Sequence, residues 1–307
     1  MFDLIIIGGG PAGTAASVYA ARKRINTLHI TREFGGQSVV SLDIQNWIGT
    51  PHISGADLAK SFEQHVTEYA DDIVTLKTGA LATNIAHAEN GFSVSTDDGE
   101  AHTAKTVLIT TGADRRKLTV PGADTFEHKG VVYCASCDGP LFAGMDTIVI
   151  GGGNAGFETA AQLLAYAKSV TLLQHNDSFK ADAITVESVL KDPNMTALKN
   201  AKITKVLGVA MVTGIEYEDV TNGEIKTLPA GGVFVEIGML PNTALAEGVV
   251  EMDEIKRIKV DAKNQRTSVP GIWAAGDCTD ELYHQNNIAA GDGVKALEDI
   301  YVYLKTR

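Results

Sequence analysis

Cysteine is scarce in this 307-residue chain, which contains only three. The disulfide scaffold of a small secreted protein requires more cysteines and an even number of them. The one C-x-x-C pair has no second C-x-x-C or H-x-x-H pair that could complete a zinc site, so we expect no metal. In a reducing cytosol, a lone pair of this kind is more often catalytic than structural.

Positive charge is also in short supply, with 26 Lys and Arg against 38 Asp and Glu, which disfavours nucleic acid as a partner. Apolar runs of eighteen or more residues are missing, so we expect no contact with a membrane. The apolar opening leads directly into a glycine turn and predicts a buried strand rather than a signal peptide. We therefore expect a cytoplasmic globular protein with one large or two ordinary domains.

Glycine, in contrast, is concentrated in two similar turns, Gly8-Gly9-Gly10-Pro11-Ala12-Gly13 and Gly151-Gly152-Gly153-Asn154-Ala155-Gly156. Each follows an apolar strand, 4–7 or 147–150, and precedes a helical pattern, 11–21 or 155–166. This context is typical of dinucleotide binding, because glycines let the backbone approach a pyrophosphate at a helix N-terminus. A tight turn without a ligand is the alternative. We predict that the turns bind two dinucleotides through Gly8, Gly10, Gly13, Gly151, Gly153 and Gly156.

The pattern around the turns indicates an internal duplication. Strands are expected at 27–31 and 169–173, after the two helices, and buried strands return at 106–110, 232–238 and 271–277. Helices are expected at 55–69 and 286–304, and short alternating runs such as 92–96 predict an antiparallel excursion. The fold class is therefore α/β, with two Rossmann-like three-layer dinucleotide-binding domains. Polar and proline-containing stretches after Gly112 and near Pro241 mark the expected crossings between them.

Chemistry is expected at Cys134-Ala135-Ser136-Cys137-Asp138. The two thiols can close into a disulfide, and a thiolate near a helix N-terminus has a lowered pKa and exchanges with other disulfides. Asp138 could carry the proton that the exchange requires, although capping a helix before Gly139 is an alternative. We assign no role to Cys278.

Four other side chains have two interpretations each. Glu33, near the end of the second strand, could bind a ribose hydroxyl or be a solvated carboxylate. Trp47 could cover a flat cofactor or belong to the core. His175 and His284 lie in predicted site loops, where a surface or capping role is at least as plausible.

Taken in order, these motifs resemble the low-molecular-weight thioredoxin reductase family, the class II pyridine nucleotide-disulfide oxidoreductases. They are also similar to the flavoprotein part of alkyl hydroperoxide reductase. The resemblance covers almost the whole chain. It rests on 8–13, Gly35-Gly36-Gln37, Asn46, Thr111-Gly112, Cys134 to Asp138, Gly151 to Glu158, Gly238 to Asn242, and Gly276-Asp277 with Gln285.

The resemblance implies an FAD domain formed by 1–112 and 243–307, with a nicotinamide domain that carries the dithiol, 113–242, inserted into it. FAD would be bound by the first glycine turn together with Glu33, Gly36, Gln37, Asn46, Gly112, Gly276, Asp277 and Gln285. Asn154 and Gln174 would join the second turn at the nicotinamide nucleotide. Cys137 would face the flavin, Cys134 would attack the protein substrate, and Asp138 would be the acid and base. Family members are homodimers whose domains rotate during turnover.

One departure from the family concerns the electron donor. NADPH-using members carry a His-Arg-Arg pattern and a further Arg after the strand that ends here at Leu173, whereas this chain has Gln174-His175-Asn176-Asp177 and then Lys180. Asn cannot replace a bidentate guanidinium clamp on the 2′-phosphate, and Lys180 offers only a point charge. Gly156, where NADPH-binding turns often have Ala, favours the same conclusion. We predict FAD with NADH as cofactors, and weak or absent use of NADPH.

The leading interpretation is a thioredoxin-disulfide reductase-like enzyme that passes electrons from NADH through FAD and the dithiol to a thioredoxin-like or glutaredoxin-like protein. A separate protein is expected as acceptor, because the first glycine turn begins at residue 8 and leaves no room for the N-terminal redox module of the peroxide-reductase relative. One alternative is the same enzyme fed by ferredoxin or reduced deazaflavin, and another is an NADH:disulfide oxidoreductase of a peroxide-reductase system. A redox-silent FAD-binding protein is disfavoured by Cys134 and Cys137.

Overall fold

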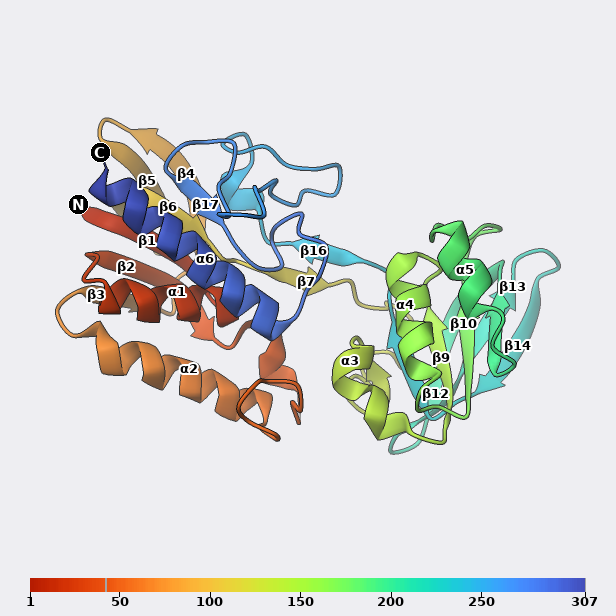
Figure 1. The fold of residues 1–307 in the computed structure, drawn as a ribbon. Coiled ribbons are helices and arrows are strands. Elements are labelled where there is room, and N and C mark those ends of the chain that lie inside the picture. The colour runs from red at the N-terminus through yellow and green to blue at the C-terminus, as the bar shows by residue number, and fades with distance from the viewer. Residues whose placement is uncertain (42, 307) are drawn as a thin grey trace. The chain divides into compact units, whose positions relative to one another are not determined.

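The computed structural model describes residues 1–41 and 43–306, and the chain divides into two compact units. Unit 1 consists of Met1–Asp114 and Leu240–Arg307, and unit 2 of Arg115–Met239 (Figure 1). The chain passes between the units in two short strands, β7 (Ala113–Arg115) and β16 (Met239–Pro241), which pair with each other. Among the described residues, no helix has the length and apolar character needed to span a membrane.

Unit 1 is built on a seven-stranded sheet in the order β3-β2-β1-β6-β5-β4, with β17 paired to β6. The β1, β2, β3, β6 and β17 strands are parallel, and the β4-β5 hairpin adds antiparallel pairs. The strands are β1 (Phe2–Gly9), β2 (Thr27–Phe34), β3 (Val74–Thr78), β4 (Ala82–Ala88), β5 (Gly91–Thr96), β6 (Ala101–Ile109) and β17 (Ile272–Ala274). The helices are α1 (Pro11–Arg22), α2 (Gly55–Ala70) and α6 (Asn286–Lys305), with 3₁₀ turns at Gly36–Val40 and Ala244–Ala246.

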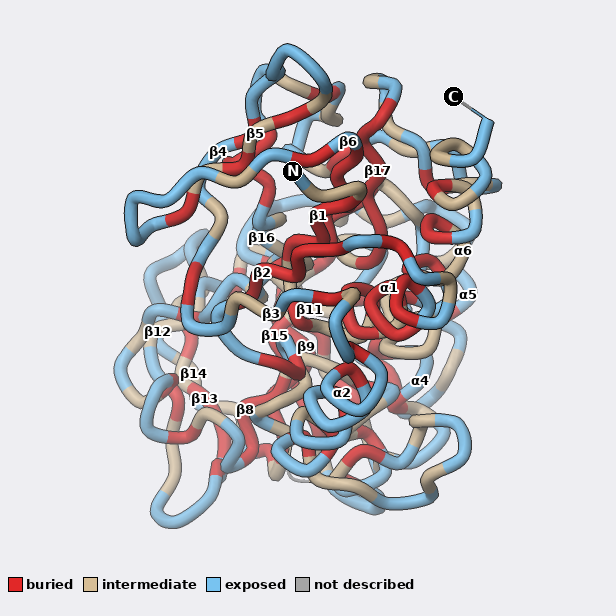
Figure 2. Tube along the Cα trace, turned by 90° about the vertical axis from the view of Figure 1, so that its left-hand side faces the viewer, coloured by how far each residue is buried: buried red, intermediate tan, exposed pale blue. Residues whose placement is uncertain are grey.

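Both faces of the central strand β1 are covered. Successive side chains of a strand point to opposite faces, so Leu4 and Ile6 pack with α1 and α6 while Ile5 and Ile7 pack with the hairpin side. All four are at most 2% exposed, and Figure 2 shows buried stretches in β1, β6 and β17. An uninterrupted apolar run before the glycine turn is therefore what this central parallel strand requires.

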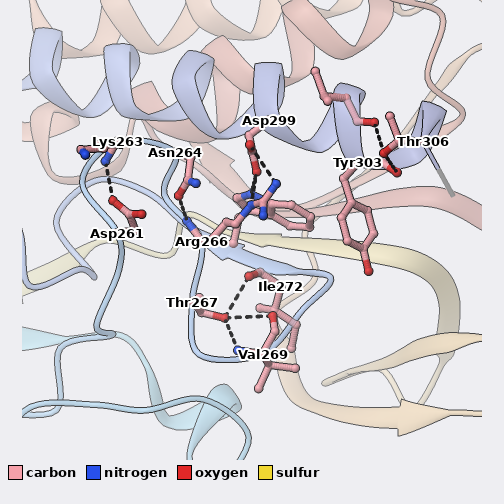
Figure 3. Close-up of polar contacts among 12 residues, drawn as sticks. Asp261, Lys263, Asn264, Arg266, Thr267, Val269, Ile272, Asp299, Tyr303 and Thr306 are labelled. Atoms are coloured by element: carbon pink, nitrogen blue, oxygen red, sulfur yellow. Dashed lines mark hydrogen bonds and ion pairs between the residues drawn. The ribbon is translucent and has the colours of Figure 1, made fainter.

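Helix α6 is fixed to the sheet by polar contacts as well as by packing. Arg266 donates to both carboxylate oxygens of Asp299 on α6, as Figure 3 shows. The indole N–H of the buried Trp273, in β17, donates to the same carboxylate at 2.9 Å. The helix also lies close against α1, because a Cβ on Gly293 would come within 2.1 Å of the Ala12 carbonyl oxygen. These contacts position the two helices that cover one face of the sheet.

Unit 2 repeats the parallel arrangement with a five-stranded sheet in the order β11-β10-β9-β15-β8. Its strands are β8 (Val131–Val132), β9 (Asp146–Ile150), β10 (Ser169–Leu173), β11 (Met195–Leu198) and β15 (Gly232–Val235). Helices α3 (Ala135–Asp138), α4 (Asn154–Leu163) and α5 (Ala183–Val189), with a 3₁₀ turn at Gly139–Phe142, accompany an antiparallel sheet of β12 (Ala201–Gly208), β13 (Val212–Asp219) and β14 (Glu224–Pro229). Val149 and Phe234 pack on the helical side, and Ile148 and Val233 on the side of the antiparallel sheet.

Three expected elements are shorter in the structure. The strand expected over 271–277 is only Ile272–Ala274. The helix expected over 155–166 ends at Leu163, because the Ala165 and Tyr166 N–H groups bond three residues back and tighten the last turn. The strand expected over 232–238 ends at Val235, before Gly238 adopts a positive φ of 108°. The antiparallel sheet of unit 2 was not predicted.

Candidate active site

The first glycine turn opens a pocket at the carboxyl ends of the strands of unit 1, with a volume of about 670 Å³. Helix α1 begins there with Gly10 as its N-cap and Pro11 in its first turn, and Gly10 has no side chain that could cap the free N–H groups. A Cβ on Gly10 would meet nothing within 4 Å, so the backbone is open to a bound group. The size of the pocket and its helix N-terminus fit the diphosphate of a dinucleotide.

Most of the residues predicted to bind FAD line this pocket. These are Gly8, Gly10, Glu33, Gly36, Gln37, Gly112, Gly276 and Asp277. Gly13 does not line it. A Cβ there would lie 1.8 Å from the Gly8 carbonyl oxygen, so this glycine allows α1 to pack closely against the end of β1.

Asn46 and Gln285 are also outside the lining of the pocket, but the fold brings them together. The Asn46 side-chain amide donates to Gln285 Oε1 at 3.2 Å, and Asn287 donates to the Asn46 carbonyl oxygen at 2.6 Å. In the pocket wall, Gln37 Nε2 lies 3.3 Å from Asp277 Oδ2. His284, which does not line the pocket, has its Nδ1 3.4 Å from Asp277 Oδ1. Both sets of contacts thus join segments about 240 residues apart in sequence.

Sequence reasoning missed part of the pocket wall. The additional residues include Ala80 to Thr83, Asn242, Ala244 and Asn286. Apart from Asn242, they carry no motif; they reach the pocket because β3 is parallel to β2 and because α6 begins beside it. Ser38 Oγ, which donates to Asn286 Oδ1 at 2.9 Å, joins the two sides.

The second glycine turn connects β9 to α4 in unit 2. Gly151 has a φ of 125°, and a Cβ on Gly156 would lie 1.9 Å from the Gly151 carbonyl oxygen. Gly153 is the N-cap of α4, has no side-chain cap bond, and would place a Cβ in open space. The Asn154 side chain accepts from the Asp182 N–H at 2.8 Å and so joins the helix to the following loop. The N-terminus of α4 is thus available to an anion, as that of α1 is.

Gln174 lies directly after β10 and is 8% exposed. Its Oε1 accepts from the Gly152 N–H at 3.0 Å, and its Nε2 donates to the Ser178 carbonyl oxygen at 3.1 Å. The amide therefore shapes both the glycine turn and the next loop. In that loop His175, Asn176, Asp177 and Lys180 are exposed.

Glu236, immediately after β15, is a buried carboxylate that sequence reasoning did not find. Thr159 on α4 donates to its Oε1 at 2.8 Å, and Arg115 lies 3.5 Å from its Oε2. Burial raises the pKa of the Glu236 carboxyl, although Arg115 and Thr159 oppose the shift. Its backbone N–H donates to the Ile150 carbonyl oxygen at 2.8 Å, so it stands beside the second glycine turn at the switch point of the sheet.

The dithiol lies on the short helix α3 of unit 2, where a disulfide joins Cys134 and Cys137. Cys134 is the N-cap, and its sulfur accepts from the Cys137 N–H at 3.1 Å. Asp138 follows, and burial raises the pKa of its carboxyl to about 6 while nearby His128 opposes the rise. Its side chain does not cap the following 3₁₀ turn. A half-buried carboxyl that gains and loses a proton near neutrality is suited to proton transfer.

Two other side chains are structural. Trp47 packs edge-on against Phe62 with ring centroids 5.4 Å apart, in a cluster beneath α2, as the core interpretation predicts. Cys278 is fully buried, and burial raises the pKa of its thiol to about 11. It is therefore not a reactive thiol.

The sequence profile of the pyridine nucleotide-disulphide oxidoreductase family matches residues 2–293, and the chain belongs to this family. Within it, the fold is that of the thioredoxin reductases. The thioredoxin reductase from Streptococcus pyogenes MGAS5005 is 34% identical, with a TM-score of 0.91 over 100% of this chain and 99% of that one. The enzyme from Giardia duodenalis is 31% identical, with a TM-score of 0.92 over 99% of both chains. The chain thus combines membership of this family with the thioredoxin reductase fold, and the family implies FAD and a nicotinamide.

Curated relatives are longer than this chain. The NADH dehydrogenase of Bacillus subtilis (strain 168) is 42% identical over 99% of this chain but only 58% of its own length. The F component of alkyl hydroperoxide reductase from Escherichia coli (strain K12) is 40% identical, again over 99% of this chain and 58% of the relative. The chain therefore spans less than two thirds of these relatives.

Proposed function

We propose that the protein is an FAD-dependent disulfide reductase that passes electrons from NADH through the Cys134–Cys137 pair to a thioredoxin-like or glutaredoxin-like protein. The observation that carries the proposal is the disulfide on α3, followed directly by the half-buried Asp138, in the unit that contains the second glycine turn. The open α1 N-terminus and the pocket of unit 1 fit the other dinucleotide, FAD.

FAD, when bound, would accept two electrons from the nicotinamide and pass them to the Cys134–Cys137 disulfide. Reduction opens the disulfide into the Cys134 and Cys137 thiols. The Cys134 thiol loses its proton to solvent, and the thiolate attacks one sulfur of the partner's disulfide to form a mixed disulfide, while protonated Asp138 supplies a proton to the released partner thiolate. Cys137 then gives its proton to the Asp138 carboxylate and attacks Cys134, which restores the disulfide. The second partner thiolate takes a proton from solvent, and the partner leaves as a dithiol. Two electrons enter and two leave.

Three observations support NADH as the donor. The exposed loop after β10 holds Asp177 and no arginine, and Lys180 offers a single cation. A 2′-phosphate would therefore meet a carboxylate and lack a guanidinium clamp. In addition, the B. subtilis relative is named an NADH dehydrogenase.

Anaerobic stopped-flow mixing tests the donor. We expect NADH to bleach the flavin and kcat/KM for NADH to exceed that for NADPH. Asp177→Arg should raise kcat/KM for NADPH about tenfold or more, since it removes a repulsive charge and adds a phosphate ligand. Glu187→Arg, an equal charge change at an exposed position of the same unit, is the control. A higher kcat/KM for NADPH in the unmodified enzyme would overturn the proposal that NADH is the donor. Bleaching of the flavin only by ferredoxin or deazaflavin would overturn the proposal of any nicotinamide donor.

The dithiol is tested with Cys137→Ser. This variant should retain FAD and be reduced by NADH, yet lose NADH-dependent reduction of a protein disulfide. If protein disulfide reduction continued unchanged, the proposed dithiol route would be wrong.

A second candidate is an NADH:disulfide oxidoreductase of a peroxide-reductase system, favoured by the likeness to the F component of alkyl hydroperoxide reductase. The acceptor distinguishes the two. Parallel assays with a thioredoxin and with the isolated redox module of such a component should show which is reduced at the higher kcat/KM. The homodimer stays a prediction, which sedimentation of the holoenzyme tests.

A further inference from the structure

A buried histidine and serine lie behind the first glycine turn. His29 on β2 and Ser17 on α1 are both 0% exposed. Ser17 Oγ lies 2.8 Å from His29 Nδ1, and His29 Nε2 lies 2.9 Å from the Gly8 carbonyl oxygen. Phe34 meets the imidazole edge-on at a centroid distance of 5.5 Å. A polar ring at such a depth is costly unless both nitrogens are paired, and here both are.

The partners fix the tautomer of His29. A carbonyl oxygen can only accept, so Nε2 carries the hydrogen and donates to Gly8. Nδ1 of the neutral ring then accepts from the Ser17 hydroxyl. Thr110 Oγ1 also lies 3.1 Å from the Gly8 carbonyl oxygen. Side chains from β2 and from the end of β6 therefore hold one carbonyl group from two sides, and Ser17 orients the first of them.

Gly8 needs such support. Its φ is 115°, and a Cβ at this position would lie 2.3 Å from the Thr110 carbonyl oxygen, so only glycine fits. Glycine also has the widest range of allowed φ and ψ angles, so its own backbone does not fix the orientation of the peptide. Helix α1 packs closely against the Gly8 carbonyl oxygen, because a Cβ on Gly13 would come within 1.8 Å of that oxygen. The orientation of the Gly8 peptide thus sets the place of the α1 N-terminus in the pocket.

We propose that His29 is a positioning residue for flavin binding: its Nε2–H, oriented by Ser17, holds the Gly8 carbonyl inside the protein and thereby preorganises the glycine turn for the diphosphate of FAD. The inference rests on the proposed function in one respect, the binding of FAD in the pocket of unit 1. It assigns the effect of His29 to a hydrogen bond and not to the volume of the ring.

The test compares three variants as apoproteins by titration with FAD. His29→Leu keeps an apolar volume and removes both hydrogen bonds; we expect Kd for FAD to rise about tenfold. His29→Gln keeps an N–H that can reach the Gly8 carbonyl, and its Kd should stay within about threefold of the unmodified protein. Ser17→Ala leaves the imidazole in place without its orienting hydroxyl and should fall between these two.

Thermal unfolding of the same apoproteins gives the second measurement. A lower Tm for His29→Leu with an unchanged Kd would assign His29 to stability alone and overturn the inference. Equal weakening by Leu and Gln would overturn the hydrogen-bond role. Should His29→Leu fail to fold, Kd values of His29→Gln and Ser17→Ala that do not differ would overturn it as well. If the unmodified apoprotein does not bind FAD, the proposed function itself fails, a result distinct from the others.

Discussion

Asp138 is the residue for which the local environment gives the clearest kinetic prediction. Because burial raises its pKa to about 6, it holds its proton below that pH and loses it above. Exchange of the reduced enzyme with a small aliphatic disulfide, whose leaving thiolate takes up a proton, should therefore slow as the pH rises through about 6, in the component that depends on proton donation. Asp138→Asn should lack this component and be slower by about 10²-fold or more.

Asp124→Asn is the matched control, since it removes an exposed carboxylate from the same unit. Both variants are compared with the unmodified enzyme across pH 5 to 9 by following the flavin absorbance after single-turnover mixing. A pH profile of Asp138→Asn that coincides with that of the unmodified enzyme would exclude Asp138 as the proton donor.

His29 makes a second prediction, about acid stability. Desolvation lowers its pKa from 6.5 to about 4, opposed only in part by the bond to Gly8. The unfolded chain therefore binds a proton at a pH where the folded protein does not, so stability is complete above about 6.5 and falls as the pH decreases toward about 4. The loss amounts to about 3 kcal/mol of unfolding free energy.

Urea unfolding of the apoprotein at several pH values measures this effect. His29→Leu should lose about 3 kcal/mol less than the unmodified protein between pH 6.5 and 4. Parallel stability curves for the two proteins over that range would contradict the assignment.

In the first glycine turn and α1, Gly10 borders the space open to a ligand, whereas Gly13 packs against the end of β1. Gly13→Ala would place a methyl group 1.8 Å from the Gly8 carbonyl oxygen, and should cost about 3 kcal/mol of unfolding free energy. Gly10→Ala meets no protein atom within 4 Å and should change stability by less than about 1 kcal/mol. Its methyl group faces the pocket, so FAD binding should weaken about tenfold or more.

Denaturant unfolding and FAD titration of the two apoproteins check the pair. Equal stability of Gly13→Ala and Gly10→Ala would mean that α1 can move away from β1 without loss, contrary to the packing described above.

The elements that the sequence predicted are those with local signals. Apolar runs ending in glycine located β1 and β9, and the helices α1 and α2 lie within a residue of the expected ranges. The antiparallel sheet β12-β13-β14 was missed because its strands have mixed exposure and are defined by pairing with one another. Ala80 to Thr83 reach the pocket only through sheet order, and the buried Glu236 carboxylate has its partners, Thr159 and Arg115, on other segments. Such features arise from tertiary contacts, which no local pattern reports.

At the scale of the whole molecule, each unit has its own sheet and its own core clusters. Calorimetry of the apoprotein should therefore resolve two transitions. FAD at 100 times its Kd should stabilise unit 1 by about 2.7 kcal/mol and leave the transition of unit 2 unchanged, and NAD⁺ should do the reverse.

Gly10→Ala serves as the control. In this variant FAD at the same concentration should shift the unfolding transition of unit 1 by less, because FAD binds more weakly. A single transition that both ligands raise equally would mean that the units unfold together.

The interrupted course of unit 1 has a consequence for biosynthesis. All strands and helices of unit 2 are encoded between residues 115 and 239, whereas β17, Gly276, Asp277 and α6 of unit 1 come later. A chain that leaves the ribosome from its N-terminus can complete unit 2 while the sheet of unit 1 still lacks its last strand and one covering helix. The unit that begins first in the sequence is therefore completed last, and flavin capture has to wait until α6 has been synthesised.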